Sequence, residues 1–239
     1  MNGSKIWTSA GQHANWMFCL VRTDREARAQ NGISFLLIDL TSPGVSFRPI
    51  RHFFGAHVFN QFFFDDVRVP VENLLLGEGR GFEIAQGRLG PGRIHHCMRI
   101  IGVAERALEM MCQRAAERVT WGKAVGARGV TQERIAQSRI EIDMCRLLTL
   151  KAADRMDKVG NKEARQEIAM IKVAAPNMAL EVIDRAMQVH GGGAMSQEFP
   201  LSYMWSRMRA LRFADGPDEV HRRQIARLEQ QLQGTVPSG

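Results

Sequence analysis

The sequence predicts an α+β protein that is mostly helical, with an antiparallel β unit followed by a bundle of antiparallel helices. Two patterns predict this class. Short apolar runs are separated by glycine and proline over residues 1–70, and apolar residues recur at spacings of three and four from residue 94 onward. The composition agrees, because 239 residues that are 45% hydrophobic and 24% charged can bury a core. Glycines at residues 77–81 mark the change between the two parts.

Four strands are expected in the first part of the chain. They cover residues 16–21, 33–40, 45–50 and 58–69. Turn signals separate them, among them Asn31-Gly32 and Thr41-Ser-Pro-Gly44, and Pro70 ends the last strand. The unit begins so abruptly that its first strands are expected to be missing from the chain.

Three long helices are expected in the second part, from apolar residues at helical spacing. The first run is Ile94, Met98, Ile101, Ala104, Leu108 and Met111; the second is Ile140, Met144, Leu147, Ala152 and Met156; the third is Ile168, Ile171, Ala175, Met178, Val182, Ala186 and Val189. Pro176 should kink the third helix or mark a break in it. Shorter helices are expected near 200–213 and 218–232. The methionines are interpreted as core residues.

The composition argues against several kinds of protein. No apolar run approaches the roughly 20 residues of a membrane span, and residues 1–7 lack the apolar region of a signal peptide. The cysteines stand far apart, which argues against a zinc site and against disulfides and favours a reducing cytoplasm. They are Cys19, Cys97, Cys112 and Cys145.

Arginine carries most of the positive charge. The net charge is +7, and only six of the 32 basic residues are lysines. Nucleic acid is one partner that such a charge could attract, but acidic and apolar residues interrupt the arginines. Neither nucleic acid nor a membrane is therefore expected as a partner. A small anionic molecule that carries phosphate explains a few of the arginines equally well.

Four segments resemble motifs of the acyl-CoA dehydrogenases, in the family's order and over essentially the whole chain. Asn2-Gly-Ser-Lys-Ile-Trp-Thr-Ser9 is similar to the family's N-G-x-K-x-W segment, and residues 64–77 are similar to F-x-D-V-x-V-P-x-x-N-L-L-G. Residues 117–123 are similar to E-R-x-[TA]-F-G-K, and residues 188–193 match most of Q-x-x-G-G-x-G. The ending at residues 214–221 resembles the subgroup formed by acyl-CoA dehydrogenase family members 10 and 11.

The resemblance implies a more detailed fold. Residues 1–74 are expected to form a partial middle β-domain, and residues 75–235 an up-down four-helix bundle. The family's N-terminal helical domain and its flavin-contacting T-E-P-x-x-G-S-D strand are expected to be absent from this chain.

Asp215 takes the position of the family's catalytic glutamate, so the resemblance implies that it is the base that removes the α-proton of the substrate. Some family members place the base at the position of Gly92, where glycine cannot serve. Asp215 is also a natural turn residue before Gly216-Pro217. Aspartate is one methylene shorter than glutamate, which withdraws the carboxylate by roughly 1 Å. Nitroalkane oxidase, which shares the fold, uses an aspartate base without CoA.

Eleven residues match positions that contact FAD in the family. They are Trp7, Thr8, Ser9, Arg118, Thr120, Trp121, Gln188, Gly191, Gly192, Pro217 and Glu219. The resemblance implies that Trp7 and Ser9 flank the flavin ring and that Arg118 meets the pyrophosphate of a neighbouring subunit's FAD. Pro217 and Glu219 stand where the family has threonine and glutamine, so this end of FAD is expected to be bound differently.

Arg93 and Gly216 are expected at the substrate. Arg93 follows Leu89-Gly-Pro-Gly92, where glycine and proline are expected to interrupt the helix and admit a thioester. The neighbouring pair His95-His96 is interpreted as packing or surface, because adjacent side chains on a helix diverge.

The resemblance as a whole implies an FAD-dependent acyl-CoA dehydrogenase of fatty acid β-oxidation. It implies an acyl-CoA substrate, electron-transfer flavoprotein as the electron acceptor, and a homodimer or homotetramer. The cytoplasmic location is expected from the cysteines, and no metal is expected. Two alternatives stay open: a catalytically inactive bundle that serves assembly, and a flavoenzyme like nitroalkane oxidase.

Overall fold

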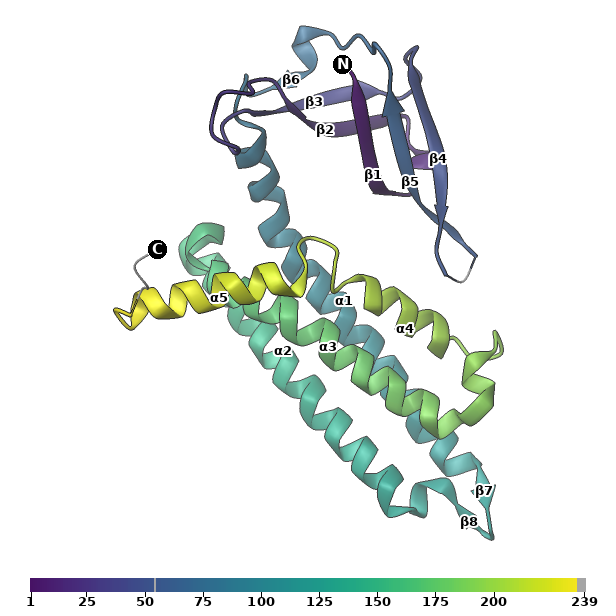
Figure 1. Cartoon of the computed structure of the whole chain (residues 1–239). Coiled ribbons are helices and arrows are strands. Elements are labelled where there is room, and N and C mark those ends of the chain that lie inside the picture. The colour runs from purple at the N-terminus through teal and green to yellow at the C-terminus, as the bar shows by residue number, and fades with distance from the viewer. Residues whose placement is uncertain (54, 236–239) are drawn as a thin grey trace. The chain divides into compact units, whose positions relative to one another are not determined.

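The computed structural model describes residues 1–53 and 55–235 and contains two compact units. They cover Met1–Arg88 and Leu89–Gly239. The first unit consists mainly of strands and the second of helices (Figure 1). The predicted α+β class with a helical majority is confirmed.

The first unit contains two small antiparallel sheets. One has the order β1-β5-β4, and the other has the order β2-β3-β6. The strands are β1 (Gly3–Ser9), β2 (Trp16–Arg22), β3 (Ile33–Asp39), β4 (Val45–Arg51), β5 (His57–Phe64) and β6 (Leu74–Leu75). The four predicted strands are present, and β5 ends at Phe64 rather than at residue 69. Ile38, Phe62 and Val67 lie at the centre of the core of this unit.

Long helices make up the second unit, and α1, α2, α3 and α4 run in alternating directions (Figure 1). The helices are α1 (Gly81–Glu117), which begins in the first unit, α2 (Gly129–Glu163), α3 (Arg165–His190), α4 (Leu201–Ala210) and α5 (Asp218–Leu232). Between α1 and α2 the short strands β7 (Val119–Thr120) and β8 (Lys123–Ala124) form a hairpin. Helix α3 packs against α2, α4 and α5, and its apolar face is almost fully buried.

Neither internal proline breaks its helix, so the expected interruption of the first helix was wrong, whereas the kink expected at Pro176 stays a prediction. Helix α1 continues through Pro91, and α3 continues through Pro176. Pro91 has no backbone N–H, so the carbonyl of Gly87 has no donor within the helix. Both residues are exposed, so water can satisfy that carbonyl. In α3 the side chain of Asn177 adds a hydrogen bond to the carbonyl of Val173, at 2.7 Å. The break at Pro176 and the interruption at Leu89–Gly92 are therefore not found.

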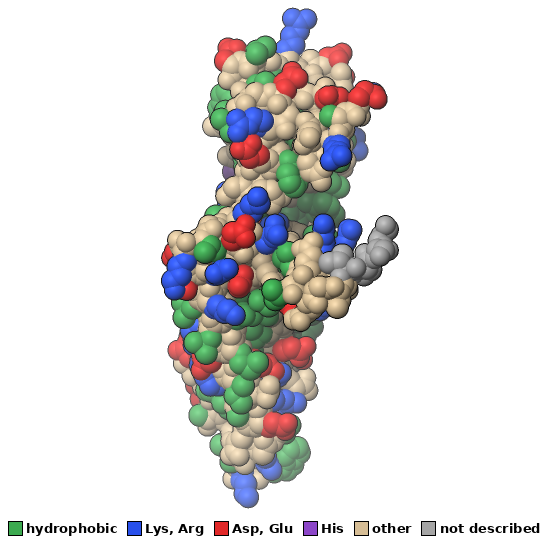
Figure 2. All heavy atoms as spheres, turned by 90° about the vertical axis from the view of Figure 1, so that its left-hand side faces the viewer, with side chains coloured by type: hydrophobic (Ala, Val, Ile, Leu, Met, Phe, Trp, Pro, Cys, Tyr) green, Lys and Arg blue, Asp and Glu red, His purple; other side chains and the backbone are tan. Residues whose placement is uncertain are grey.

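The first three residues of the second predicted apolar run face outward, whereas Ala152 is buried and Met156 packs against the core. Ile140, Met144 and Leu147 on α2 are 52%, 64% and 68% exposed. The buried positions of α2 are Thr131, Ser138, Ile142, Cys145, Thr149 and Ala152. Small residues allow close helix packing, and the hydroxyls of Ser138 and Thr149 are satisfied by carbonyls four residues earlier in α2. Hydrophobic side chains are accordingly visible among charged ones on the helical part of the face in Figure 2.

The methionines are divided between core and surface. Met110, Met111, Met178 and Met208 are buried, whereas Met98 and Met144 are more than half exposed. The interpretation of every striped methionine as a core residue was therefore wrong for these two. None of the helices in the described part of the chain is both long and apolar enough to cross a membrane.

Candidate active site

Asp215 lies in a tight turn between α4 and α5, which we call the Asp215 turn (residues 211–217). Its backbone is left-handed, with φ of 56°, and Gly216 follows with φ of 107°. Aspartate enters this region more readily than most residues, and glycine enters it freely. A Cβ atom on residue 216 would lie 2.9 Å from Nε2 of His221. The turn therefore requires glycine after the aspartate.

Helix α1 contacts Asp215 through two side chains on one face. Nε2 of His96 lies 3.1 Å from Oδ2 of the Asp215 carboxylate, and Nε of Arg93 donates to the backbone carbonyl of Asp215 at 2.9 Å. The two residues are three positions apart, so they project to the same side of the helix. The interpretation of His96 as packing or surface was wrong, because it contacts the carboxylate; His95 is exposed.

Lys172 on α3 binds the Asp215 turn through two backbone carbonyls. It has no exposed surface, and its Nζ donates to the carbonyls of Leu211 at 2.6 Å and Gly216 at 3.3 Å. Burial lowers the pKa of Lys172, and the nearby Cys97 and Asp218 oppose that change. Lys172 is not among the predicted site residues, although it is a single lysine among the apolar residues of the third run.

Asp218 at the start of α5 is the buried carboxylate of the site. It is 1% exposed, and its Oδ2 accepts from Nε of Arg212 at 2.7 Å and from Nδ2 of Asn177 at 3.1 Å. Its Oδ1 has no hydrogen-bond partner in the described part of the chain. Pro217 occupies the N-cap of α5, and Glu219 is exposed in the first turn. Asp218 therefore ties both ends of the Asp215 turn to α3.

Electrostatics favour the ionised form of Asp215 and the uncharged form of His221. The hydrogen bond from His96 lowers the pKa of Asp215; partial burial opposes this, and the charges of Arg93 and Lys172 add to it. Burial and the nearby Arg93 and Lys172 lower the pKa of His221 to about 4. At neutral pH the site therefore presents an ionised carboxylate above an uncharged imidazole. The Asp215 side chain is 24% exposed, so a proton donor can reach it.

A second group of predicted residues meets at the far end of α3. Nη1 of Arg118 donates to the carbonyl of His190 at 3.3 Å, and a Cβ atom on Gly191 would lie 3.1 Å from the same nitrogen. Gly191 has φ of 72° and ends the helix. The structure thus brings Arg118 and Gly191 together, while Gln188 and Gly192 are exposed nearby in sequence.

The hairpin of β7 and β8 presents an exposed indole. Trp121 is 93% exposed and has φ of 47°. Arg128 donates to the carbonyl of Thr120 at 2.7 Å, and its guanidinium lies 5.9 Å from the centre of the Trp121 ring. Arg128 therefore contacts two residues of the predicted cofactor segment, Thr120 and Trp121.

The remaining predicted cofactor residues lie on β1 in the first unit. Trp7 is 61% exposed with φ of 64°, and its ring meets Phe59 edge-on at 5.8 Å. The carbonyl of Thr8 accepts from Nδ2 of Asn60 at 3.2 Å, and Ser9 pairs with Phe59. The register shifts between Lys5 and Thr8, which is where the indole turns outward.

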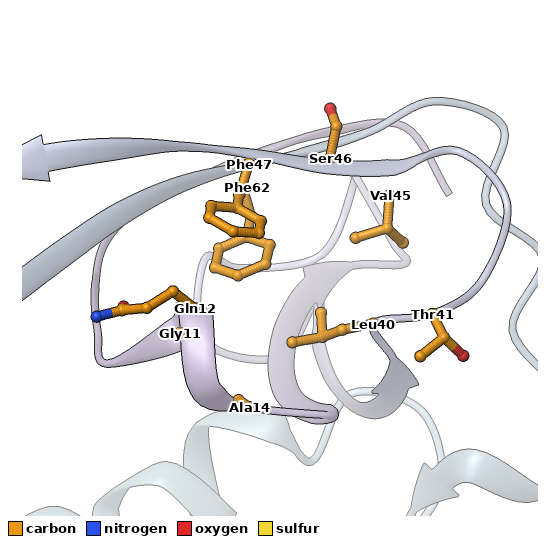
Figure 3. A pocket seen from close by; sticks show the side chains of 9 residues that line it. All are labelled: Gly11, Gln12, Ala14, Leu40, Thr41, Val45, Ser46, Phe47 and Phe62. Atoms are coloured by element: carbon orange, nitrogen blue, oxygen red, sulfur yellow. The ribbon is translucent and has the colours of Figure 1, made fainter.

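Two open cavities of the first unit contain none of the predicted site residues. One of about 310 Å³ is lined by uncharged residues (Figure 3): Gly11, Gln12, Ala14, Leu40, Thr41, Val45, Ser46, Phe47 and Phe62. The other, of about 460 Å³, lies beside Met1–Lys5 and Arg25. Neither of these two cavities is lined by an acidic residue or a histidine. No three described His, Cys, Asp or Glu residues are grouped to hold a metal ion.

Comparison with known proteins covers nearly the whole chain. The sequence profile of the acyl-CoA dehydrogenase C-terminal domain matches residues 79–229, and that of the middle domain of the same family matches residues 1–67. Human acyl-CoA dehydrogenase family member 11 is 48% identical over 239 residues; the match includes 96% of this chain and 30% of that protein.

Two solved structures match the fold closely. An acyl-CoA dehydrogenase family protein from Mycobacterium abscessus has a TM-score of 0.93 at 45% identity, covering 97% of this chain. The glutaryl-CoA complex of glutaryl-CoA dehydrogenase has a TM-score of 0.86 at 27% identity, covering 98% of this chain. The chain spans 58% of each of these two proteins.

Proposed function

Because the chain belongs to the acyl-CoA dehydrogenase family, we propose that it is part of an FAD-dependent enzyme that dehydrogenates an acyl-CoA thioester. Asp215 removes the proton from the carbon α to the thioester carbonyl. Acyl-CoA dehydrogenases are FAD-dependent, and the bound flavin supplies the acceptor for the hydride that leaves the β-carbon.

The geometry of the Asp215 turn carries this proposal. A turn or cap aspartate would bond the first amides of α5, but the N-cap of α5 is Pro217, without a side-chain cap. The Asp215 carboxylate instead contacts His96 and keeps a quarter of its surface exposed. A held, partly exposed carboxylate is suited to general-base work. We assign Arg93 and Gly216 to the substrate side of this base.

The residues at the end of α3 fit the pyrophosphate of FAD. The guanidinium of Arg118 offers several N–H donors in one plane, which suits paired phosphate oxygens. A side chain on residue 191 would crowd this guanidinium, and glycine leaves the space open. We assign the same cofactor to the partly buried Thr120 and to the exposed Trp121, Gln188 and Gly192. Trp7, Thr8 and Ser9 are assigned to the flavin ring, and Pro217 and Glu219 to a further part of FAD.

The partners follow from the same assignment. The substrate class is acyl-CoA, as in the glutaryl-CoA complex of the relative described above, and the pathway is fatty acid β-oxidation. Electron-transfer flavoprotein is the proposed electron acceptor, as it is for some members of the family. The four free thiols are consistent with a cytoplasmic location.

A homodimer or homotetramer is the proposed assembly. The outward stripe of Ile140, Met144 and Leu147 supports it, because large apolar residues in a row on one helix face are unusual on a monomer. We propose domain limits at residues 1–74 and 75–235.

One observation favours a second enzyme class, a flavoenzyme like nitroalkane oxidase. The base is an aspartate, and its pKa is lowered by His96. A weaker base suits a carbon acid that is more acidic than a simple acyl thioester. Turnover of nitroalkanes without CoA would favour this class.

The test replaces the base. In the FAD-loaded protein, Asp215→Asn is expected to lower kcat for acyl-CoA dehydrogenation by about 10²–10⁴-fold, measured with a dye acceptor over a panel of acyl-CoA thioesters. The flavin absorption band should remain, because Asp215 is not assigned to the cofactor. Retained turnover would remove Asp215 from its role, and a protein that takes up no FAD would favour the inactive assembly bundle.

A further inference from the structure

We propose that His96 is a positioning residue for the base: its Nε2–H holds Oδ2 of Asp215, so that Oδ1 is presented to the substrate. The proposal deepens the proposed function and rests on it. It starts from the distance of 3.1 Å between His96 Nε2 and Asp215 Oδ2. Both side chains are partly covered, at 21% and 24% exposed, so solvent screens their contact only in part.

Arg99 determines which nitrogen of His96 carries the proton. Nη2 of Arg99 lies 2.6 Å from Nδ1 of His96. A guanidinium can only donate hydrogen bonds, so Nδ1 must accept one and carries no proton. The ring proton is therefore on Nε2, where it points to the carboxylate. Arg99, His96 and Asp215 form a chain of two directed hydrogen bonds.

These two hydrogen bonds give the two carboxylate oxygens of Asp215 different roles. Oδ2 accepts the hydrogen bond of His96, and that nitrogen already bears its proton, so His96 cannot take over the proton from the base. Oδ1 forms the new O–H bond when the α-carbon loses its proton. A fixed carboxylate matters here because aspartate is a methylene short, and a misplacement of about 1 Å can cost on the order of a hundredfold in rate.

Other titratable groups lie around the Asp215 turn and must be considered together with His96. They are Arg93 on α1, Lys172 on α3, and Asp218 and His221 on α5. Arg93 and Lys172 contact backbone carbonyls of the Asp215 turn. His96 is thus the group whose hydrogen bond to the carboxylate itself can be removed without releasing the turn.

The first experiment needs no cofactor. Carboxyl carbons of aspartate are labelled with ¹³C, the Asp215 signal is assigned by its loss in Asp215→Asn, and the signal is followed with pH. In His96→Leu the pH midpoint of the Asp215 titration should rise, because burial then raises the pKa of Asp215 without the opposing hydrogen bond from His96. In His96→Gln it should stay near the wild-type midpoint, since the glutamine amide can donate from the place of Nε2. His95→Leu, one residue away and exposed, is the matched control.

Labelling with ¹⁵N at histidine checks the tautomer, which should be Nε2–H for His96 and should change when Arg99→Met removes the donor. In the FAD-loaded protein, His96→Leu should lower kcat by about 10–100-fold, with recovery in His96→Gln and a smaller change in KM. An unmoved midpoint in His96→Leu, or a proton on Nδ1 in the wild type, overturns the proposal. A shifted midpoint in a protein without any dehydrogenase activity would leave the role of His96 intact and reject the proposed function.

Discussion

His221 is a buried histidine on α5 that lies against Gly216 of the Asp215 turn. It is 1% exposed, and neither ring nitrogen has a hydrogen-bond partner among the residues that the structure describes. Its pKa is lowered from an ordinary 6.5 to about 4. The folded protein therefore binds a proton here less tightly than the unfolded chain does, and the folded state favours uncharged His221.

This difference predicts how stability depends on pH. Between pH 6.5 and 4 the unfolded chain binds more protons at His221, so the free energy of unfolding should fall as the pH is lowered through this window. The loss is up to about 3 kcal/mol, at about 1.4 kcal/mol per pH unit. Urea unfolding at several pH values should show a flatter dependence in His221→Gln, which cannot take up a proton.

The matched control for this prediction is His95→Gln, on the exposed side of α1. It should keep the wild-type dependence between pH 6.5 and 4. Equal slopes in wild type and His221→Gln would show that burial of His221 does not govern stability in this window.

At the residue scale, sequence reasoning could find Asp215 but not its partners. Asp215 was recognisable because the family motif places a carboxylate there and a glycine follows. His96 and Lys172 were not, because their roles depend on which helix face meets the Asp215 turn, and that is decided by packing between segments more than 30 residues apart. The adjacent pair His95-His96 did diverge as expected; only one of the two met the carboxylate.

At the element scale, the ammonium group of Lys172 connects α3 to the segment between α4 and α5. It lies on α3, and the carbonyls that it binds close the segment between α4 and α5. Replacing it by methionine keeps the length of the side chain but leaves both carbonyls without their donor. Each unpaired buried group costs about 1–3 kcal/mol.

Lys172→Met should therefore lower the free energy of unfolding by about 1–3 kcal/mol or more, measured by chemical denaturation. Lys151→Met, on the exposed surface of α2, should stay within about 0.5 kcal/mol of wild type. If the two variants unfold alike, the buried ammonium does not hold the turn. Lower activity in Lys172→Met at full folding would further tie the turn to the base.

The helices illustrate where periodicity alone was insufficient. The first and third runs are mostly buried as predicted. The first part of the second run, Ile140 to Leu147, faces outward, because small and hydroxyl-bearing residues of α2 occupy much of the helix contact. Hydroxyl groups that bond their own helix backbone do not need water, so Ser138 and Thr149 can be buried. A rule that assigns apolar residues to the core therefore does not predict that hydroxyl-bearing residues of α2 are buried while apolar ones are exposed. The prolines at 91 and 176 likewise lie inside continuous helices, α1 and α3.

At the scale of the whole molecule, the fold class followed from two periodicities and a family resemblance, and each unit has its own core. The chain nevertheless spans only 30% of human family member 11 and 58% of each matched solved structure. Surface that is apolar in this chain is therefore a place to look for further contacts. The stripe on α2 is such a surface, and it can be tested without knowledge of the substrate.

Met144→Glu combined with Leu147→Glu should convert the proposed homo-oligomer into monomers. Both side chains are more than 60% exposed in the single chain, so charging them costs the isolated fold little. Two charges on each copy would, however, be buried without partners if the stripe packs against a second copy. Sedimentation velocity should therefore show the mass of one chain, while circular dichroism stays helical. Leu232→Glu, 75% exposed at the end of α5, should leave the assembly unchanged. An unaltered mass in the double variant would exclude the α2 stripe as the subunit interface.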